Sequence, residues 1–188
     1  MQTFTASFLG RDSTGVVAAV TRLLFEADCS VMAVSQTILS GDFAAIFMVQ
    51  APDSLAPDNL HAHLVTGLER ANVDLSVIVR PAVTGSVAAT VKCEPFVVTA
   101  SGPDGHGLLA ALSQVFGRHK VNIESLRALL DEEHDSEHAL SIFEVMVPEG
   151  VDLGRLGREL RHEAQRLGWT VSIQHRDIFE AMHRIGTF

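Results

Sequence analysis

The chain has 188 residues, of which 47% are hydrophobic and 20% are charged. This composition supplies enough apolar side chains for packed cores and excludes an intrinsically disordered chain. The net charge is −9, and the sequence contains no Tyr and one Trp. It therefore lacks the basic surface and the stacking aromatic residues of a nucleic-acid-binding protein, and we expect no direct contact with nucleic acid.

The sequence also points away from membranes and from the secretory route. It contains no run of about 18 apolar residues, so we expect no membrane-spanning segment. The first residues, MQTFTASFLG, lack a basic start followed by a long apolar stretch, and we expect no secretory signal. Cys29 and Cys93 form no ligand or disulfide pattern. These features predict a reduced, cytoplasmic protein.

The first half of the chain predicts the order strand, helix, strand, strand, helix, strand. Apolar residues between Val16 and Leu24 have the spacing of one helical face. The sequence SGD at 40–42 indicates a tight turn between the second and third strands. We expect strands over 4–9, 31–39, 43–51 and 75–79, and helices over 16–24 and 60–71.

The second half repeats this plan 92 residues later. In the turn before the first helix, Gly102, Asp104 and Gly107 align with Gly10, Asp12 and Gly15. We expect strands over 96–101, 121–130, 139–147 and 169–173, helices over 108–116 and 153–167, and one further helix over 176–185. Each copy fits a ferredoxin-like unit, in which two helices cover one face of four antiparallel strands.

The repeat sets the expected domain organisation. The first domain covers residues 1–82 and the second covers residues 95–176. The intervening segment, 83–94, is rich in small residues and reads as a linker. Residues 177–188 form a C-terminal helix and tail without a counterpart in the first copy.

Two loop motifs resemble those of tandem ACT-domain proteins. The first copy has GRDSTGVVAAVTRLL followed by ADCSV, and the second has SGPDGHGLLAALSQVFGRHKVNI. The second motif contains the G-x-D-x-x-G loop and the x-N-I strand start of that family. The similarity covers about residues 3–175 and is greatest to two-domain proteins of the glycine cleavage system transcriptional repressor type. It implies an α+β fold of two ACT-like βαββαβ domains plus a C-terminal helix.

The resemblance implies a regulatory role. Members bind amino acids or other small ligands near the first loop and associate through strands or helices. We therefore expect an amino-acid-binding protein that modulates a partner, a transcription regulator or a metabolic enzyme, in amino-acid metabolism or its transcriptional control. The alternative is a ligand-free protein-interaction scaffold with degenerate ACT domains. The open face of each sheet also needs cover, either from the other domain or from a second chain, and we expect a homodimer.

The chemistry of the second loop suits a zwitterionic ligand. Gly102 and Gly107 allow backbone conformations that other residues avoid, and they permit close approach of a ligand. Asp104 is expected to cap a helix that begins near His106, whose amides can bind a carboxylate. On the alternative interpretation, the acidic residues are only caps, the glycines only turn residues, and His106 is merely exposed.

The resemblance adds the start of the second strand to the expected site. Asn122 makes either a local backbone bond or a ligand contact, and the family pattern favours the contact. The first copy has Ser30 there, so we expect the second copy to be the better site. The expected ligand-binding residues are Gly102, Asp104, Gly105, His106, Gly107, Asn122 and Ile123, with Gly10, Asp12 and Gly15 in the first copy.

The remaining polar residues indicate neither catalysis nor a metal. The segment DEEHDSEH could place His134 and His138 among carboxylates, but its spacing matches no defined zinc motif and favours a solvated acidic loop. No nucleophile elbow, phosphate-binding loop or Cys–His arrangement is present. We nominate no catalytic residue and expect no cofactor and no enzyme activity.

Overall fold

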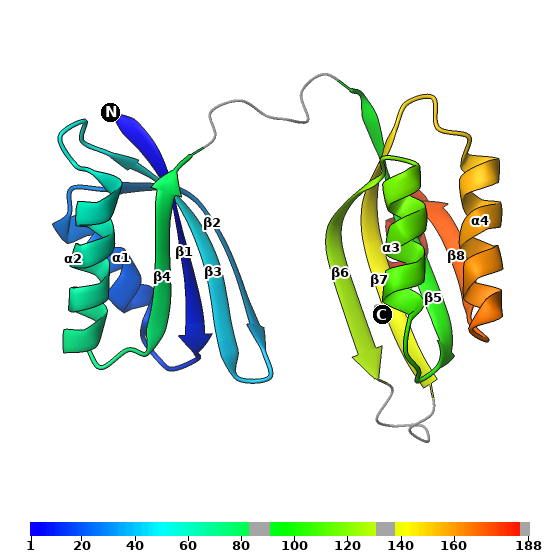
Figure 1. Ribbon diagram of the computed structural model, residues 1–188, viewed down its shortest axis with the longest axis horizontal. Coiled ribbons are helices and arrows are strands. Elements are labelled where there is room, and N and C mark those ends of the chain that lie inside the picture. The colour runs from blue at the N-terminus through cyan, green and yellow to red at the C-terminus, as the bar shows by residue number, and fades with distance from the viewer. Residues whose placement is uncertain (83–90, 131–137, 185–188) are drawn as a thin grey trace. The chain divides into compact units, whose positions relative to one another are not determined.

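The computed structural model describes residues 1–82, 91–130 and 138–184. The chain divides into two compact units, Met1–Ser86 and Val87–Phe188, here called the first and second domains. Each contains a four-stranded sheet with antiparallel pairing throughout and two helices over one face (Figure 1). The predicted α+β class, with two ferredoxin-like βαββαβ domains and a C-terminal helix, is confirmed.

The first domain follows the predicted element order. Its strands lie in the order β2-β3-β1-β4, so the first and third strands form the centre of the sheet. Its elements are β1 (Gln2–Arg11), α1 (Val16–Glu26), β2 (Ser30–Leu39), β3 (Asp42–Ala51), α2 (Pro57–Arg70) and β4 (Leu75–Pro81).

The second domain has the same topology, with the strand order β6-β7-β5-β8. Its elements are β5 (Cys93–Pro103), α3 (Leu108–Arg118), β6 (Asn122–Leu130), β7 (His138–Pro148), α4 (Leu153–Arg166), β8 (Thr170–His175) and α5 (Arg176–Arg184). Residues 83–90 of the expected linker lie outside the described part of the chain, and β5 begins at Cys93.

Buried and more exposed residues alternate along the central strands, and the buried ones form the core. In β1 every second residue from Phe4 to Phe8 is buried, and in β3 the buried residues run from Phe43 to Ala51 in the same way. This period-2 pattern directs one side of the sheet toward the helices. The helices contribute buried residues at the predicted spacing, including Val20 and Leu24 of α1.

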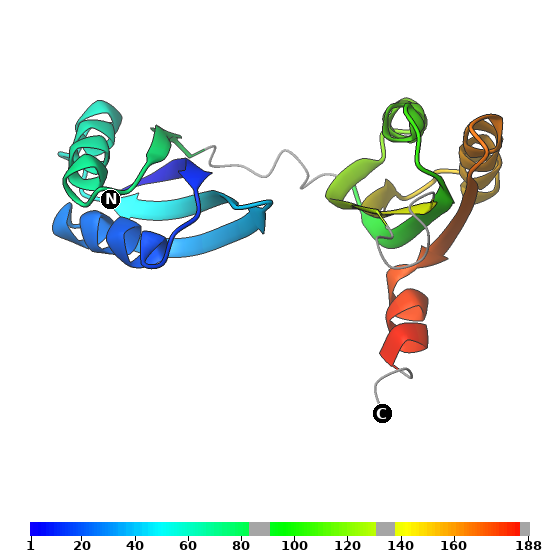
Figure 2. The ribbon, with the colours of Figure 1, turned by 90° about the horizontal axis from the view of Figure 1, so that it is seen from below.

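The outer faces of the two sheets differ. Figure 2 shows α5 on the opposite side of the second sheet from α3 and α4. Val97, an outward-facing residue of β5, is only 2% exposed. Arg176 at the start of α5 pairs with Glu124 at 2.8 Å and lies 3.7 Å from Glu144. These contacts hold the beginning of α5 against the sheet.

Among its described residues the first domain has no corresponding helix, and its outer sheet face exposes apolar side chains. Leu9, Ile46, Met48 and Ile78 have exposed fractions between 42% and 64%. They come from three neighbouring strands, β1, β3 and β4. Exposed apolar patches of this kind mark surfaces that associate with other molecules.

A charged cluster joins the end of α3 to α4 in the second domain. The Glu159 carboxylate accepts a hydrogen bond from Arg155 Nε at 2.9 Å and lies 3.2 Å from His119 Nε2 and 3.4 Å from Arg118. The hydrogen bond from Arg155, followed by the one from His119, lowers the pKa of Glu159 to about 2. The cluster therefore stabilises the fold only while this carboxylate is ionised.

The Glu159 cluster predicts an acid-dependent stability difference. The folded-state pKa lies below the ordinary value of 4.5, so the stabilisation is present above pH 4.5 and is lost as the pH falls toward about 2. Glu159→Gln should unfold at lower urea concentration than the wild type above pH 4.5, and the two curves should converge on acidification.

Glu163→Gln is the matched control for this experiment. Glu163 lies on the same helix, and Arg166 is its one ion-pair partner among the described residues. If the difference in unfolding urea concentration between the wild type and Glu159→Gln did not change with pH, the ionised carboxylate would not be the cause of that difference.

Candidate functional site

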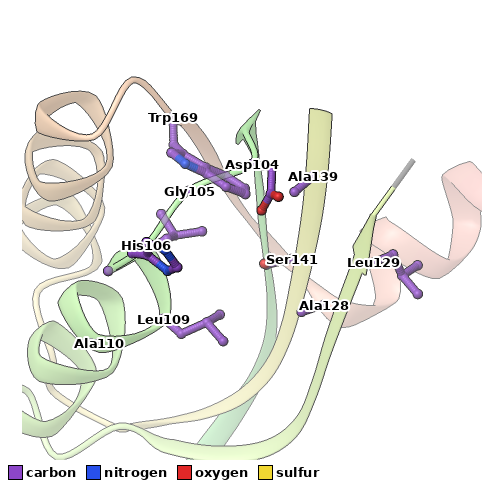
Figure 3. Close-up of a pocket in the computed structure, with 12 residues that line it drawn as sticks. Asp104, Gly105, His106, Leu109, Ala110, Ala128, Leu129, Ala139, Ser141 and Trp169 are labelled. Atoms are coloured by element: carbon purple, nitrogen blue, oxygen red, sulfur yellow. The ribbon is translucent and has the colours of Figure 1, made fainter. Parts of the chain in front are cut away.

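A pocket of about 410 Å³ lies at the carboxyl end of β5 in the second domain. We call it the β5–α3 pocket. The loop before α3 with the first turn of that helix, and three segments distant from it in sequence, form its walls (Figure 3). They are the loop 104–107, the first turn of α3 at 108–110, Ala128 and Leu129 of β6, Ala139 and Ser141 of β7, and Trp169 before β8. Its volume falls in the range of small-molecule sites.

The helix at this pocket begins without a side-chain cap. Gly107 is the N-cap residue of α3 in a left-handed conformation, with φ 101°, and Gly15 does the same for α1, with φ 95°. The expectation that Asp104 and Asp12 cap these helices is therefore wrong. The helices begin at Leu108 and Val16, and the glycine turn places each Asp three residues before the N-cap position.

The uncapped helix leaves amide donors at the pocket. The first helical bond runs from the Ala111 amide to the Gly107 carbonyl at 2.9 Å. The amides of Leu108, Leu109 and Ala110 have no acceptor among the described residues. All three residues line the pocket, where free amides and the helix dipole favour an anion.

Gly102 has a different role from the one expected. Its φ is not in the left-handed region, so it supplies no special backbone conformation. A Cβ at this position would lie 2.5 Å from Trp169 Cγ, so glycine is needed for close packing of the indole. Gly10 is also needed for close packing in the first domain, but against backbone: a Cβ there would lie 2.1 Å from the Asp74 carbonyl oxygen.

Two exchanges between the repeats explain why the second domain has space here. Phe8 and Ala45 face each other across β1 and β3, and Gly10 faces Phe43. The equivalent pairs in β5 and β7 are Ala100 with Ser141 and Gly102 with Ala139. Two alanines therefore stand where the first domain has buried phenylalanine rings. Trp169 packs against Gly102, at the position that Leu75 has beside Gly10 in the first domain, and it fills part of that space.

Ser141 adds a polar group to this wall. It is 3% exposed, yet its hydroxyl makes no hydrogen bond to another described residue. Figure 3 shows its side chain on the same side of β7 as Ala139, toward the first turn of α3. Asp104 and His106 are exposed residues of the loop beside the pocket.

The structure separates the expected site residues. Asp104, Gly105, His106 and Gly107 line the β5–α3 pocket together. Asn122 and Ile123 do not join them, because they pair with Met146 and Val145 near the far end of β7. Asn122 instead lines a separate hollow of about 310 Å³ with His119 and Lys120.

The expected residues of the first domain lie in a similar loop. Gly10 pairs with Phe43 of β3 and with Leu75 of β4, and the Asp12 amide donates to the Gly41 carbonyl at 2.9 Å. Val16 N donates to the Ser13 carbonyl at 3.3 Å, so this helix start has one amide fewer for a ligand than α3. Phe43, which is 1% exposed, stands opposite Gly10 and fills the position of Ala139.

Ser141, Ala139 and Trp169 were not among the expected site residues. A residue-by-residue comparison of the inward faces of the two repeats would have indicated them, because each differs in size or polarity from its counterpart. His134 and its acidic neighbours lie outside the described residues. Within the described part of the chain, no group of three or more His, Cys, Asp or Glu residues is arranged to hold a metal ion.

The described helices include none with the length and apolar character needed to cross a bilayer.

The sequence pattern of the ACT domain matches residues 2–81 and again residues 94–174. The chain is a tandem ACT-domain protein. ACT domains are regulatory modules that generally bind small molecules such as amino acids. The two matches cover both ferredoxin-like domains and leave α5 outside the family pattern.

Two relatives match about half of the chain. The tandem ACT-domain protein is 33% identical over 89 residues to a UPF0237 protein of Methanopyrus kandleri, covering 47% of this chain and 96% of that one. It is 35% identical, with the same coverage, to a UPF0237 protein of Pyrobaculum aerophilum.

Solved structures share the tandem fold. A protein of unknown function from Galdieria sulphuraria has a TM-score of 0.75 at 20% identity, covering 93% of this chain and 98% of that one. A protein provisionally named a glycine cleavage system transcriptional repressor has a TM-score of 0.61 at 17% identity, covering 92% and 96%. At these identities the similarity of the tandem ACT-domain protein to both structures is one of fold.

Proposed function

We propose that this tandem ACT-domain protein senses an amino acid in the β5–α3 pocket and thereby regulates a protein partner. The partner is a transcription regulator or an enzyme of amino-acid metabolism in the cytoplasm. One observation carries the proposal: three free amides at the start of α3 face, across a pocket of about 410 Å³, the hydroxyl of Ser141, a residue that is 3% exposed and makes no side-chain hydrogen bond to another described residue. Neither polar feature has a partner among the described residues.

The pocket has the parts that an amino acid needs. The amides of Leu108, Leu109 and Ala110 can receive a carboxylate at the positive end of the helix dipole. The carboxylate of Asp104, exposed in the adjoining loop, can attract the ammonium group. The space beside Gly105 is open, because a Cβ at this position would contact only the Pro103 carbonyl oxygen, at 3.8 Å.

The first domain supports the protein in a different way. Its helix start has fewer free amides, and a buried Phe43 stands at the position of the pocket residue Ala139. We propose that it does not bind the ligand and that it joins two copies of the chain through its exposed sheet face.

A calorimetric screen of the twenty amino acids tests the proposed function. We expect at least one to bind with a stoichiometry of one per chain. At about 100 times its dissociation constant it should stabilise the protein by about 2.7 kcal/mol. The same ligand should raise the thermal midpoint of the full chain.

The control is Gly41→Ala in the β2–β3 turn of the first domain, which strains a position of φ 86° without touching the pocket. This variant should bind as the wild type does. Binding of no amino acid at millimolar concentration would overturn the proposal and favour a ligand-free interaction scaffold. Two equivalent sites per chain would contradict the assignment to the second domain.

A further inference from the structure

We infer that Ser141 makes the β5–α3 pocket select a ligand whose side chain is short and ends in a hydroxyl or an amide. This inference rests on the proposed function, because it assigns the side-chain preference of the same site. It concerns the wall of the pocket formed by β7, whereas the carboxylate is assigned to the start of α3.

The first argument is the state of the Ser141 hydroxyl. Ser141 is almost entirely buried as a residue, but its Oγ is not among the enclosed polar atoms without a partner in the described part of the chain, so the hydroxyl opens onto the pocket that Ser141 lines. Ser141 is the single polar residue among the buried described residues, and its hydroxyl has no described partner. A ligand atom that donates or accepts a hydrogen bond would satisfy it, since a hydroxyl can do both.

The second argument is an internal comparison. Ala45 occupies the same place in the first domain, in register with Phe8 as Ser141 is in register with Ala100. Ala45 is 4% exposed and its domain has the same topology. The fold therefore does not need a hydroxyl at this position. The hydroxyl occurs in the second domain, where Ala100 and Ala139 replace phenylalanines and leave space beside Ser141.

The third argument is the character of the remaining walls. Between the loop and β7, the residues around Ser141 are apolar, namely Leu108, Leu109, Ala128, Ala139 and Trp169. The acidic residue and the histidine that line the pocket, Asp104 and His106, lie in the loop and are exposed. Among the described residues of this wall, a long charged ligand side chain would find no partner, whereas an apolar side chain with one polar end group matches them.

Two pairs of amino acids with similar shapes test the inference, threonine with valine and asparagine with leucine. Affinities are measured by calorimetry for the wild type and Ser141→Ala. The wild type should prefer the polar member of at least one pair by roughly 5- to 10-fold, the effect of one hydrogen bond. Ser141→Ala should lose this preference and bind the apolar member as the wild type does or better.

Ser172→Ala is the matched control. It removes a serine from the opposite face of the same sheet, where the hydroxyl lies 2.7 Å from that of Thr99. It should keep the wild-type preference. Equal affinities within both pairs in the wild type, or a preference that survives Ser141→Ala, would overturn the inference while leaving the proposed function intact. Binding of no amino acid by the wild type would overturn both.

Discussion

Ala139→Phe should reduce amino-acid binding to the second domain below calorimetric detection. The substitution restores the arrangement of the first domain, where Phe43 stands opposite Gly10 and is buried. In the second domain the added ring would enter the β5–α3 pocket, whose wall includes Ala139. Trp169 already fills part of this space, so the thermal midpoint without ligand is measured as well, to show that the variant is folded.

Leu140→Phe is the control for this experiment. Leu140 is the next residue along β7, faces the other side of the sheet and is 37% exposed, so the same ring is introduced away from the pocket. Its binding should equal that of the wild type. Wild-type affinity in Ala139→Phe would place the ligand elsewhere in the protein.

The wild-type protein should be a homodimer that is broken by Ile46→Asp together with Ile78→Asp. Both residues lie on the exposed sheet face of the first domain. On this face the paired strands carry charges only toward their ends, at Arg11, Asp42 and Arg80. A nearly uncharged centre allows two chains of net charge −9 to approach. Buried unpaired carboxylates would oppose that contact.

Light scattering measures the outcome. The wild type should have twice the chain mass of 20.3 kDa, and the double variant should have the chain mass itself. Phe25→Asp is the matched control, because Phe25 is 79% exposed on α1, away from the sheet face. A wild-type mass of 20.3 kDa would contradict dimerisation. A dimeric double variant would show that another surface joins the chains.

Local periodicity was sufficient to predict the fold. The apolar spacing in α1 and α3 and the alternation in the central strands follow directly from helix and strand geometry. The helix starts were less predictable. An Asp before a helical pattern suggests a cap, but the capping position is held by Gly15 and Gly107, whose positive φ turns the chain instead.

The candidate site could be predicted only where it is continuous in sequence. Asp104 to Gly107 form one loop and were recognised together, whereas Ser141 and Trp169 reach the pocket through strand register. Asn122 lies away from this loop for a physical reason. The intervening helix has 11 residues and carries the chain about 1.5 Å per residue back along the sheet. Asn122 therefore begins β6 at the end opposite the loop.

The exchange of Phe8 and Phe43 for Ala100 and Ala139 has a consequence for duplicated domains in general. When two copies of a fold share one chain, their cores need not serve the same purpose. One copy can keep its aromatic packing and secure the stability of the chain. The other can give up contacts that single-domain proteins can rarely spare, since marginal stability limits what one core can lose. Duplication thus lets recognition arise by removing side-chain bulk rather than by adding a new loop.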